Sequence, residues 1–469
     1  MARLLYLLTG GAITLFWIVF AVTSVRERKK RAAVISGGVA FGFGAVWFGW
    51  FFLLQPPGGQ LLIPVALAGL LTLLFFTPPG RPVTETTRNI TSRVDERDVI
   101  FAREEYASGS DKYQRYYDRR PEFKAMDDRI RRLPKLLTPG GKFYDPHQSR
   151  AVESLFEIIE ELTPEVAGPT GQDTKERPEN PAGGESVAGV NTLPATSDAP
   201  AFTAAVKRLA TRLGALEVGI TPLDPAFVYS HVGRGPEPWG NRIENRHRYA
   251  IVFSLEMRYR NVEAAPRLPI TEESARKYLK GSLISVTLAE YIRQLGYPAR
   301  AHVAGSNYQI MLPPVAQDAG LGEVGRFGYL ISRRFGARVR LGAVTTDLPL
   351  VPDAPFAFGV QEFCAICKRC AVNCPSGSIP REAKETVRGV AKWPLSVETC
   401  LYYWRFIGTD CGLCMKVCPY SHPRAFVHDI VRTGIERSRI ARYLATWGEN
   451  LFYGRRVKFP AAERRSLAE

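Results

Sequence analysis

The chain has 469 residues and a mass of 52.2 kDa, enough for two or three domains, so burial of a core is not limiting. Its 62 Lys and Arg residues outnumber 46 Asp and Glu residues, which gives a net charge of +16, and 45% of the residues are hydrophobic. These values exclude simple disorder, a collagen-like repeat and a small disulfide-stapled fold. A uniformly soluble protein is also excluded, because no charged residue occurs from 32 to 80.

The composition of the N-terminal residues indicates a membrane anchor. Residues 4–25 are uncharged, and this run is long enough to cross a bilayer core as a helix. A second span is expected at 32–54 and a third at 61–77. A cleaved signal peptide is the alternative for the first run, but its basic residues, 26–31, follow the run instead of preceding it. We therefore expect residues 1–80 to form an anchor of three transmembrane helices.

The basic segment 26–31 predicts the orientation, because positively charged loops stay on the cytoplasmic side. Three crossings then place the N-terminus outside and everything after Arg81 inside. We predict a protein of the inner (cytoplasmic) membrane, in contact with membrane lipid, with its catalytic domain on the cytoplasmic side. Residues 424–469 form a basic helical tail that nucleic acid or anionic lipid could use, although a solvated helix face is favoured.

Two polar segments follow the anchor. Residues 81–163 have a helical pattern, with acidic and basic residues mixed around Tyr113, Tyr116 and Tyr117, and are expected to be the N-terminal helical segment of the catalytic region. Residues 164–200 contain six Pro and five Gly and no aromatic residue. Such a composition cannot bury enough surface to offset its ordering entropy, so this segment is expected to be a flexible linker.

The chain becomes mixed α/β from residue 201, and we expect the catalytic core at 201–355. Thr271 is expected to be the N-cap of a long helix that stops at Gly296, with Glu272 and Glu273 in its first turn. Hydrophobic spacing predicts a further helix at 202–213 and strands at about 216–220, 249–255 and 339–345.

All eight cysteines lie between Cys364 and Cys418, as in a metal site, whereas a secreted disulfide framework would scatter them. The spacing is C-x2-C-x2-C-x3-C-P followed by C-x10-C-x2-C-x3-C-P. In two-cluster ferredoxins, the cysteine after the x3 gap ligates the other cluster. We therefore predict a ferredoxin-like domain at 356–423 with two [4Fe–4S] clusters. Zinc is the alternative, but four-cysteine zinc sites need neither the Cys-Pro ends nor this repeated pattern.

The spacing also predicts which cysteines share a cluster. Cluster one is expected to take Cys364, Cys367, Cys370 and Cys418. Cluster two is expected to take Cys374, Cys400, Cys411 and Cys414. Such centres transfer single electrons.

Ordered motifs around the cysteines resemble the corrinoid-dependent reductive dehalogenases. They are Ala319-Gly320-Leu321-Gly322-Glu323-Val324-Gly325-Arg326, Phe335-Gly336-Ala337-Arg338-Val339-Arg340, Thr346-Asp347-Leu348-Pro349-Leu350 and, upstream, Glu96-Arg97-Asp98-Val99-Ile100-Phe101-Ala102-Arg103. The resemblance implies an α+β or α/β, nitroreductase-like corrinoid-binding core plus a bacterial ferredoxin-like module with two [4Fe–4S] clusters, here preceded by transmembrane helices. It also implies base-off cobalamin whose Co(I) state removes halide from an organohalide.

The resemblance implies site residues as well. Tyr278 would be the proton donor, with Ser274 four residues before it on the same helical face. Arg340 would be its basic partner and Asn307 a polar residue on the substrate side. A phenol with a pKa near 10 is a poor acid, but a nearby guanidinium stabilises the phenolate. A helix-surface tyrosine and a strand-edge arginine are the alternative interpretation. Residues expected near the corrinoid are Gly320, Gly322 and Glu323.

Two other functions fit parts of the sequence. An epoxyqueuosine reductase, acting on tRNA, shares cobalamin and similar cysteine spacing, but the spans and Tyr278 argue against it. A non-catalytic, membrane-anchored iron–sulfur electron-transfer subunit would have no use for the α/β segment before Cys364. The expected partners are a small organohalide and an electron donor such as a ferredoxin, a flavodoxin or a quinol-linked protein. No nucleic acid partner is expected.

Overall fold

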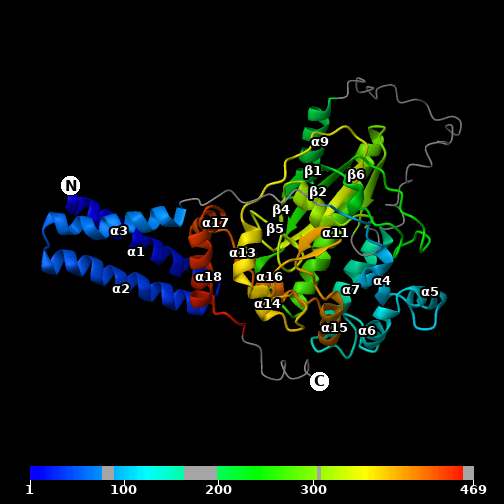
Figure 1. Cartoon of the computed structure of the whole chain (residues 1–469), viewed down its shortest axis with the longest axis horizontal. Coiled ribbons are helices and arrows are strands. Elements are labelled where there is room, and N and C mark those ends of the chain that lie inside the picture. The colour runs from blue at the N-terminus through cyan, green and yellow to red at the C-terminus, as the bar shows by residue number, and fades with distance from the viewer. Residues whose placement is uncertain (77–88, 163–197, 304–307, 458–469) are drawn as a thin grey trace.

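The computed structural model of the chain describes residues 1–76, 89–162, 198–303 and 308–457. Three long helices project from a larger body that contains an α/β core and the cysteine-rich module (Figure 1). The linker expected at 164–200 lies almost wholly outside the described residues.

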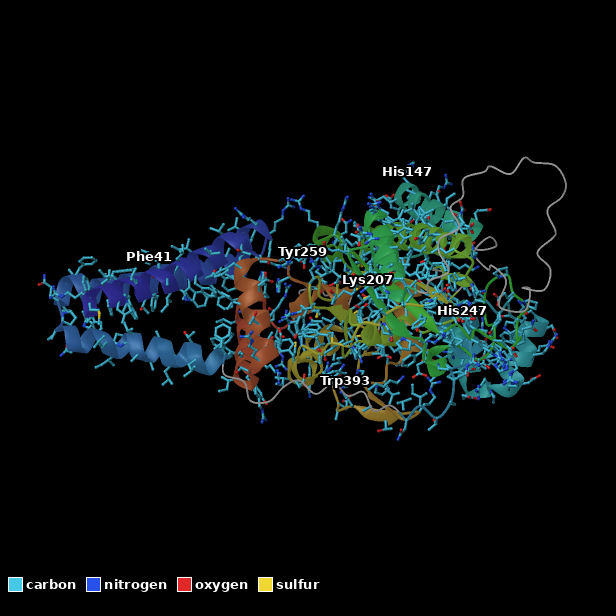
Figure 2. The ribbon with its side chains drawn as sticks, turned by 90° about the horizontal axis from the view of Figure 1, so that it is seen from above. Phe41, His147, Lys207, His247, Tyr259 and Trp393 are labelled. Carbon is cyan, nitrogen blue, oxygen red and sulfur yellow. The ribbon has the colours of Figure 1, made fainter. Side chains whose placement is uncertain are left out.

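The three N-terminal helices are α1 (Ala2–Arg26), α2 (Lys30–Leu54) and α3 (Gly58–Phe76). By length and composition α1 and α2 could each cross a membrane, whereas the apolar stretch of α3, Gly58–Leu73, is shorter. Figure 2 labels the exposed Phe41 of α2 and shows these helices extending away from the body, which they contact at one end through the C-terminal helices. The helices expected at 4–25 and 32–54 are present, and the crossing of a membrane by any of the three helices stays a prediction.

Helices α1 and α2 pair through reciprocal aromatic contacts. The Tyr6 hydroxyl donates to the Trp47 carbonyl at 2.8 Å, and the Trp47 indole donates to the Tyr6 carbonyl at 3.1 Å. The two rings stack with their centroids 4.4 Å apart. Gly10 makes this approach possible, because an added Cβ there would lie 2.1 Å from Trp47 Nε1.

The α/β core is built on a four-stranded antiparallel sheet in the order β1-β2-β6-β3. Its strands are β1 (Glu217–Pro222), β2 (Tyr249–Glu256), β3 (Ala299–His302) and β6 (Val339–Thr346). Every residue of β6 is buried, because α9 (Ala199–Arg212) and α11 (Leu268–Gln294) cover one face of the sheet and α12 (Leu312–Asp318) the other. The strands and helices expected in this region are confirmed within a few residues.

The start of α11 differs from the expectation. Thr271 is not the N-cap, since the helix already begins at Leu268. Pro269 in the first turn explains this, because its fixed φ is pre-organised for a helix start. The Thr271 hydroxyl instead accepts a hydrogen bond from the backbone of Asp410 at 2.9 Å. The end of the helix is as predicted, with Gly296 at φ +88° just beyond it.

Helices precede this core in the polar segment, where a helical pattern was expected. They are α4 (Ile100–Glu104), α5 (Asp111–Arg119), α6 (Pro121–Arg131) and α7 (Pro146–Glu161). The corner before α11 is α10 (Tyr259–Glu263), and two short strands, β4 (Gly322–Val324) and β5 (Leu330–Ser332), form a separate ribbon.

The cysteine-rich module shares a hydrophobic core with the adjoining α/β core, which contributes residues such as Met257, Ile270 and Phe327. Its elements are α13 (Val360–Cys367), α14 (Arg369–Asn373), the hairpin β7 (Glu385–Val387) and β8 (Val390–Lys392), α15 (Val397–Ile407) and α16 (Leu413–Lys416). The described part of the basic C-terminal tail is helical, as predicted. It forms α17 (Phe426–Arg437) and α18 (Arg439–Tyr453), which lie between the module and the three long helices (Figure 1).

Candidate active site

The structure brings the eight cysteines together in two sets. Cys364, Cys367, Cys370 and Cys418 line one small cavity. The remaining four, Cys374, Cys400, Cys411 and Cys414, lie close enough to influence one another's ionisation. We call these groups the first and second cysteine sets. The spacing predicts the same two groups as cluster ligands, and that assignment stays a prediction.

Burial disfavours the thiolate form in both sets. It raises the pKa of Cys364 to about 11 and, together with the neighbouring Cys414 and Cys374 thiols, raises the pKa of Cys400 to about 12. A bare thiolate would be costly in this interior, whereas a bound metal centre takes thiolates directly. The grouping of four buried thiols therefore fits iron–sulfur ligation.

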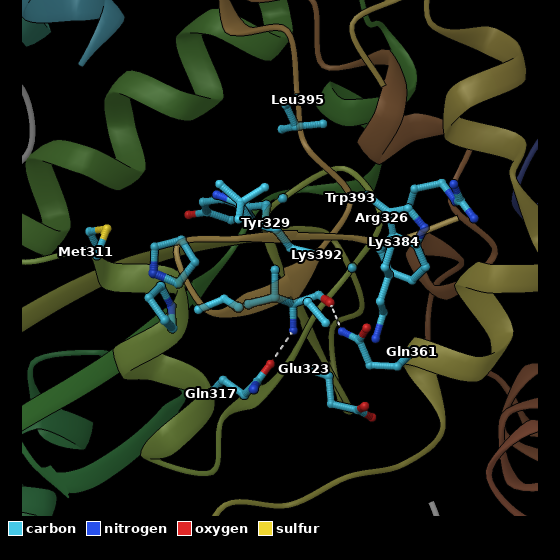
Figure 3. A pocket seen from close by; sticks show the side chains of 18 of the residues that line it. Met311, Gln317, Glu323, Arg326, Tyr329, Gln361, Lys384, Lys392, Trp393 and Leu395 are labelled. Atoms are coloured by element: carbon cyan, nitrogen blue, oxygen red, sulfur yellow. Dashed lines mark hydrogen bonds between the residues drawn. The ribbon is translucent and has the colours of Figure 1, made fainter. Parts of the chain in front are cut away.

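A cavity of about 1540 Å³ lies between α12, the β4–β5 ribbon, the β7–β8 hairpin and α13 (Figure 3). Pockets for drug-sized ligands span roughly 300–1,000 Å³, so this one has room for a larger cofactor beside a small substrate. Its aromatic wall includes Tyr229, Tyr278, Tyr308, Tyr329 and Trp393. Its polar side chains include Gln317, Gln361, Lys384 and Lys392.

Hydrogen bonds hold the cavity wall in place. The Gln317 side chain accepts from the Val324 N–H at 2.8 Å, and the Gln361 amide donates to the Val324 carbonyl (Figure 3). Arg326 donates to the Cys364 carbonyl at 3.1 Å and lies over the Trp393 ring, 4.5 Å from its centroid. The wall is thereby joined to the first cysteine set.

Arg340 connects the cavity to the second cysteine set. It lies on β6, and its Nη2 donates to the Ser274 hydroxyl of α11 at 2.8 Å. Its guanidinium carbon is 5.3 Å from the ring centroid of Tyr278 and 5.8 Å from that of Tyr329. On its other side, Nη1 is 3.6 Å from the Met415 sulfur.

The charges around Arg340 keep it ionised. Burial alone would lower the pKa of Arg340, but the nearby Tyr278, Tyr329 and Asp410 raise it above its usual value. The Asp410 carboxylate is 4.0 Å from the guanidinium. Cys414 also raises the pKa of Arg340, which shows that the second cysteine set is close to this cation. Burial raises the pKa of Tyr329.

The predicted site residues have different places in this arrangement. Tyr278 lines the cavity, and Arg340 and Ser274 lie together behind it. Glu323 also lines the cavity, but its carboxylate accepts hydrogen bonds from the backbone of Phe358 at 2.7 Å and of Val360 at 3.1 Å. Asn307 lies outside the described residues.

The two glycines expected near the corrinoid are not among the described residues that line the cavity. Gly320 has φ +75° and faces the Ala354 carbonyl, which an added Cβ would approach to 2.6 Å. Gly322 pairs with Ser332 in the β4–β5 ribbon. Both glycines therefore serve close backbone packing behind the cavity wall.

Three residues at the site were not predicted: Tyr329, Asp410 and Met415. Asp410 directly precedes Cys411 and Met415 directly follows Cys414, so both could have been proposed from position alone. Tyr329 had no such signal, because it lies in a Gly-containing turn without periodicity.

Comparison with known proteins gives three results. The 4Fe-4S dicluster domain family matches residues 363–422. A tetrachloroethene reductive dehalogenase of Desulfitobacterium hafniense is 31% identical over 278 residues, which cover 49% of this chain and 50% of that protein. The solved structure of a catabolic reductive dehalogenase in complex with 3-bromo-4-hydroxybenzoic acid matches with a TM-score of 0.55 and 26% identity, over 84% of this chain and 48% of that one.

An epoxyqueuosine reductase of Listeria monocytogenes is 30% identical over only 119 residues, 24% of this chain and 30% of that protein. The chain spans about half the length of the curated dehalogenases it matches. In sequence and in structure the chain is similar to reductive dehalogenases, oxidoreductases with iron–sulfur centres, and this confirms the resemblance predicted from its motifs.

Proposed function

We propose that this protein reductively dehalogenates a small organohalide. One carbon–halogen bond is broken, two electrons and one proton are consumed, and the hydrocarbon product and a halide ion are released. The observation that carries the proposal is the placement of Tyr278 on the cavity wall, with the buried Arg340 between it and the second cysteine set.

We assign one [4Fe–4S] cluster to each cysteine set and a base-off cobalamin to the cavity. The cavity volume, its aromatic wall and its amide and ammonium side chains suit a macrocycle that carries amide groups. The described lining residues include no histidine, in keeping with binding without an imidazole ligand. When bound, a corrinoid would supply the strong reductant that breaks the carbon–halogen bond.

The protein residues would control the proton. Tyr278 has a hydroxyl proton to donate, and the Arg340 charge stabilises the phenolate that remains. Arg340 cannot give up a proton itself, so its role is electrostatic. Ser274 and Asp410 hold the guanidinium in position from two sides.

The position of the two cysteine sets supports an order of electron transfer. Glu449 of α18 raises the pKa of Cys367 and Cys418, so the first set lies next to the C-terminal helices. The second set lies next to Arg340. Electrons from a ferredoxin, a flavodoxin or a quinol-linked donor would enter at the first set and leave from the second.

We further propose that the chain is anchored in the inner membrane, with its catalytic part on the cytoplasmic side. The basic turn between α1 and α2 contacts the body of the protein: Lys29 pairs with Glu263 at 2.6 Å, and Arg31 donates to the Leu451 carbonyl at 2.9 Å. Since basic turns stay cytoplasmic, the body would be cytoplasmic too. Helix α18 would lie at the lipid surface with three exposed apolar residues, Tyr443, Leu444 and Trp447.

Replacing Tyr278 by Phe tests the reaction. The variant should keep about eight iron atoms and about one cobalt atom per chain after anaerobic purification, as two cubane clusters and one corrinoid require. Its turnover should fall by about 10²–10⁴-fold, the usual contribution of a positioned general acid. Tyr291→Phe, on the same helix but not among the described lining residues, should turn over normally. Wild-type turnover by Tyr278→Phe would overturn the proton-donor role.

The sequence is also similar to that of an epoxyqueuosine reductase, and the same preparation can test that function. A tRNA substrate would give a complex that weakens steeply with salt, whereas an organohalide reductase should show no specific tRNA complex. A preparation with full iron but no cobalt would instead indicate an electron-transfer subunit.

A further inference from the structure

A buried cluster of ionisable side chains lies where the anchor meets the cysteine-rich module, far from the cavity. Glu27 belongs to the turn between α1 and α2, His422 follows the last cysteine by four residues, and His428 lies on α17. Each of the three is only 8% exposed. The proposed dehalogenation uses none of them, so a role for this cluster would be independent of that reaction.

The three side chains converge on one point. Glu27 Oε1 is 2.7 Å from His428 Nε2, and Glu27 Oε2 is 3.4 Å from His422 Nδ1. One ligand atom from each residue lies within 4.8 Å of the others. Tetrahedral zinc with bonds of about 2.0–2.1 Å holds its ligand atoms roughly 3.3 Å apart. The two imidazoles stack with centroids 4.6 Å apart and an interplanar angle of 13°, so one ring must rotate before both nitrogens face the same ion.

Two of these atoms also lack a hydrogen bond. Glu27 Oε2 and His422 Nδ1 are both buried. The two atoms are 3.4 Å apart, and neither has a hydrogen-bond partner among the described residues. Buried polar atoms are nearly always satisfied, so a pair of unsatisfied atoms that face each other points to a missing partner between them. A cation accepted by both would satisfy them together.

The surroundings of His422 select the nitrogen that would bind. Its Nε2 lies 3.3 Å from the Glu449 carboxylate, which Arg369 contacts from the other side at 3.4 Å. A carboxylate on the far nitrogen of an imidazole is the usual outer contact of a metal-binding histidine, because it fixes the tautomer and the ring orientation. Nδ1, the unsatisfied atom, is thereby turned toward Glu27.

We propose that Glu27, His422 and His428 form a binding site for a divalent zinc ion. Two imidazoles and one carboxylate are ligands that zinc accepts, and three protein ligands leave a further position for water. With neutral imidazoles, the Glu27 carboxylate leaves one positive charge at the site, and Glu449, which also pairs with Arg369, lies beside it. The ion would tie the turn of the membrane hairpin to the module that carries the first cysteine set.

The alternative occupant of this site is a proton. Burial alone would raise the pKa of Glu27, but the attraction of the neighbouring His422 and His428 outweighs burial and lowers the pKa to about 2. A charged imidazole paired with this carboxylate would also hold the junction together. The two arrangements differ in zinc content, which can be measured directly.

The test uses the full chain, purified in detergent under anaerobic conditions and incubated with Zn²⁺ before removal of unbound ion. The wild type should hold about one zinc per chain in addition to its iron, with nitrogen and oxygen ligands at about 2.0–2.1 Å in X-ray absorption and no sulfur at about 2.3 Å. His428→Ala and Glu27→Gln should reduce bound zinc to less than about a tenth at unchanged iron content. His147→Ala, at an exposed position of α7, should bind zinc as the wild type does.

Glu449→Gln provides a milder variant that keeps all three ligands. It should weaken zinc binding by about 10–100-fold, as loss of an outer carboxylate does. A wild-type protein with complete iron that retains no zinc would overturn the proposal. A sulfur shell, or equal zinc in the wild type and in His428→Ala, would do the same, because the ion would then lie elsewhere.

Discussion

The cysteine-rich module has a buried group of charges on each of two sides, and the two groups differ in chemistry. On the cavity side, Arg340 lies with Asp410 beside Tyr278. On the membrane side, Glu27 contacts a ring nitrogen of His422 and one of His428, and the two rings stack on each other. A guanidinium is charged at every accessible pH, whereas an imidazole changes its protonation near neutrality and binds metals.

The two groups also differ in how they are held. Arg340 and Ser274 belong to β6 and α11, which pack against each other throughout the α/β core. Glu27, His422 and His428 come from a turn, a loop and a separate helix. The packing of β6 against α11 holds a charge in a fixed position, which suits catalysis. The turn, the loop and the helix on the other side can be held together by an ion or a proton that their side chains share. The first arrangement suits electrostatic support of a phenol, and the second suits the attachment of an anchor.

The largest effect is expected at Arg340. Arg340→Met leaves Asp410 buried without its partner, which should lower the free energy of unfolding by about 3–5 kcal/mol. It also removes the charge beside Tyr278, so turnover per folded chain should fall by about 10²–10³-fold. Initial rates normalised to cobalt content, together with denaturant unfolding, measure both effects.

A buried arginine on the same sheet gives the matched control. Arg300 of β3 pairs with Glu237 at 2.7 Å and is 2% exposed. Arg300→Met should destabilise the fold to a similar extent, yet turnover per folded chain should stay at the wild-type value. If both variants lost turnover equally, the effect of Arg340 would be structural rather than catalytic.

Glu27→Gln should give the next largest effect, on stability alone. The substitution removes the carboxylate that both imidazoles face, and loss of one partner of a buried ionic group costs about 3–5 kcal/mol. Glu263→Gln removes a more exposed carboxylate at the same junction, where it pairs with Lys29. Both side chains of this pair are half-buried but still reach water, and solvent screening weakens such pairs, so this control should lose less unfolding free energy than Glu27→Gln. Equal unfolding free energies for the two variants would show that the buried Glu27 carboxylate contributes no more than the half-buried Glu263 carboxylate.

Local patterns predicted much of the fold. The uncharged runs predicted α1 and α2, and hydrophobic spacing predicted β2 and β6 because burial follows the period of the element. The start of α11 was wrong, since capping by Thr271 competed with Pro269 and the proline determined the first turn. Cysteine spacing predicted both sets, because short spacings determine which thiols can converge.

Contacts between distant segments could not be predicted from local patterns. Arg340 and Ser274 are 66 residues apart, and only the family resemblance suggested that they belong together. Glu27 and His428 are 401 residues apart. In the sequence Glu27 is a single acid within a basic segment, so that segment indicated orientation in the membrane and nothing more. The chain must fold before Glu27 has histidine neighbours.

A smaller, pH-dependent effect is expected at Glu273, which lies beside Ser274 at the corner between α10 and α11. Burial alone would raise the pKa of Glu273, but hydrogen bonds from the Arg258 backbone and the Asn261 side chain outweigh it and lower the pKa. A lowered carboxyl pKa stabilises the folded state above the unfolded-state pKa, and this contribution is lost as the pH falls through the folded-state pKa.

The wild type should therefore exceed Glu273→Gln in unfolding free energy by about 1.5–3 kcal/mol near neutral pH. The difference should shrink on acidification below about pH 4.3, where carboxylates begin to protonate. Denaturant unfolding of both proteins across this range measures it. A difference that did not change with pH would show that the shape of the side chain, and not its charge, holds the corner.

The smallest effect is expected within the anchor, and it tests whether the two sides are energetically separate. A Cβ added at Gly10 would lie against the Trp47 indole, whereas a Cβ added at Gly11 meets nothing within 4 Å, so Gly11→Leu is the control for Gly10→Leu. Overpacking of this kind costs about 1–3 kcal/mol, so only Gly10→Leu should loosen the α1–α2 pair, seen as a lower unfolding temperature in detergent. Arg340 and Tyr278 belong to elements of the α/β core, so turnover driven by a soluble reductant should be the same in both variants. A loss of turnover in Gly10→Leu alone would mean that the anchor and the cavity unfold as one cooperative unit. The cavity side and the membrane side of the module would then not be energetically separate.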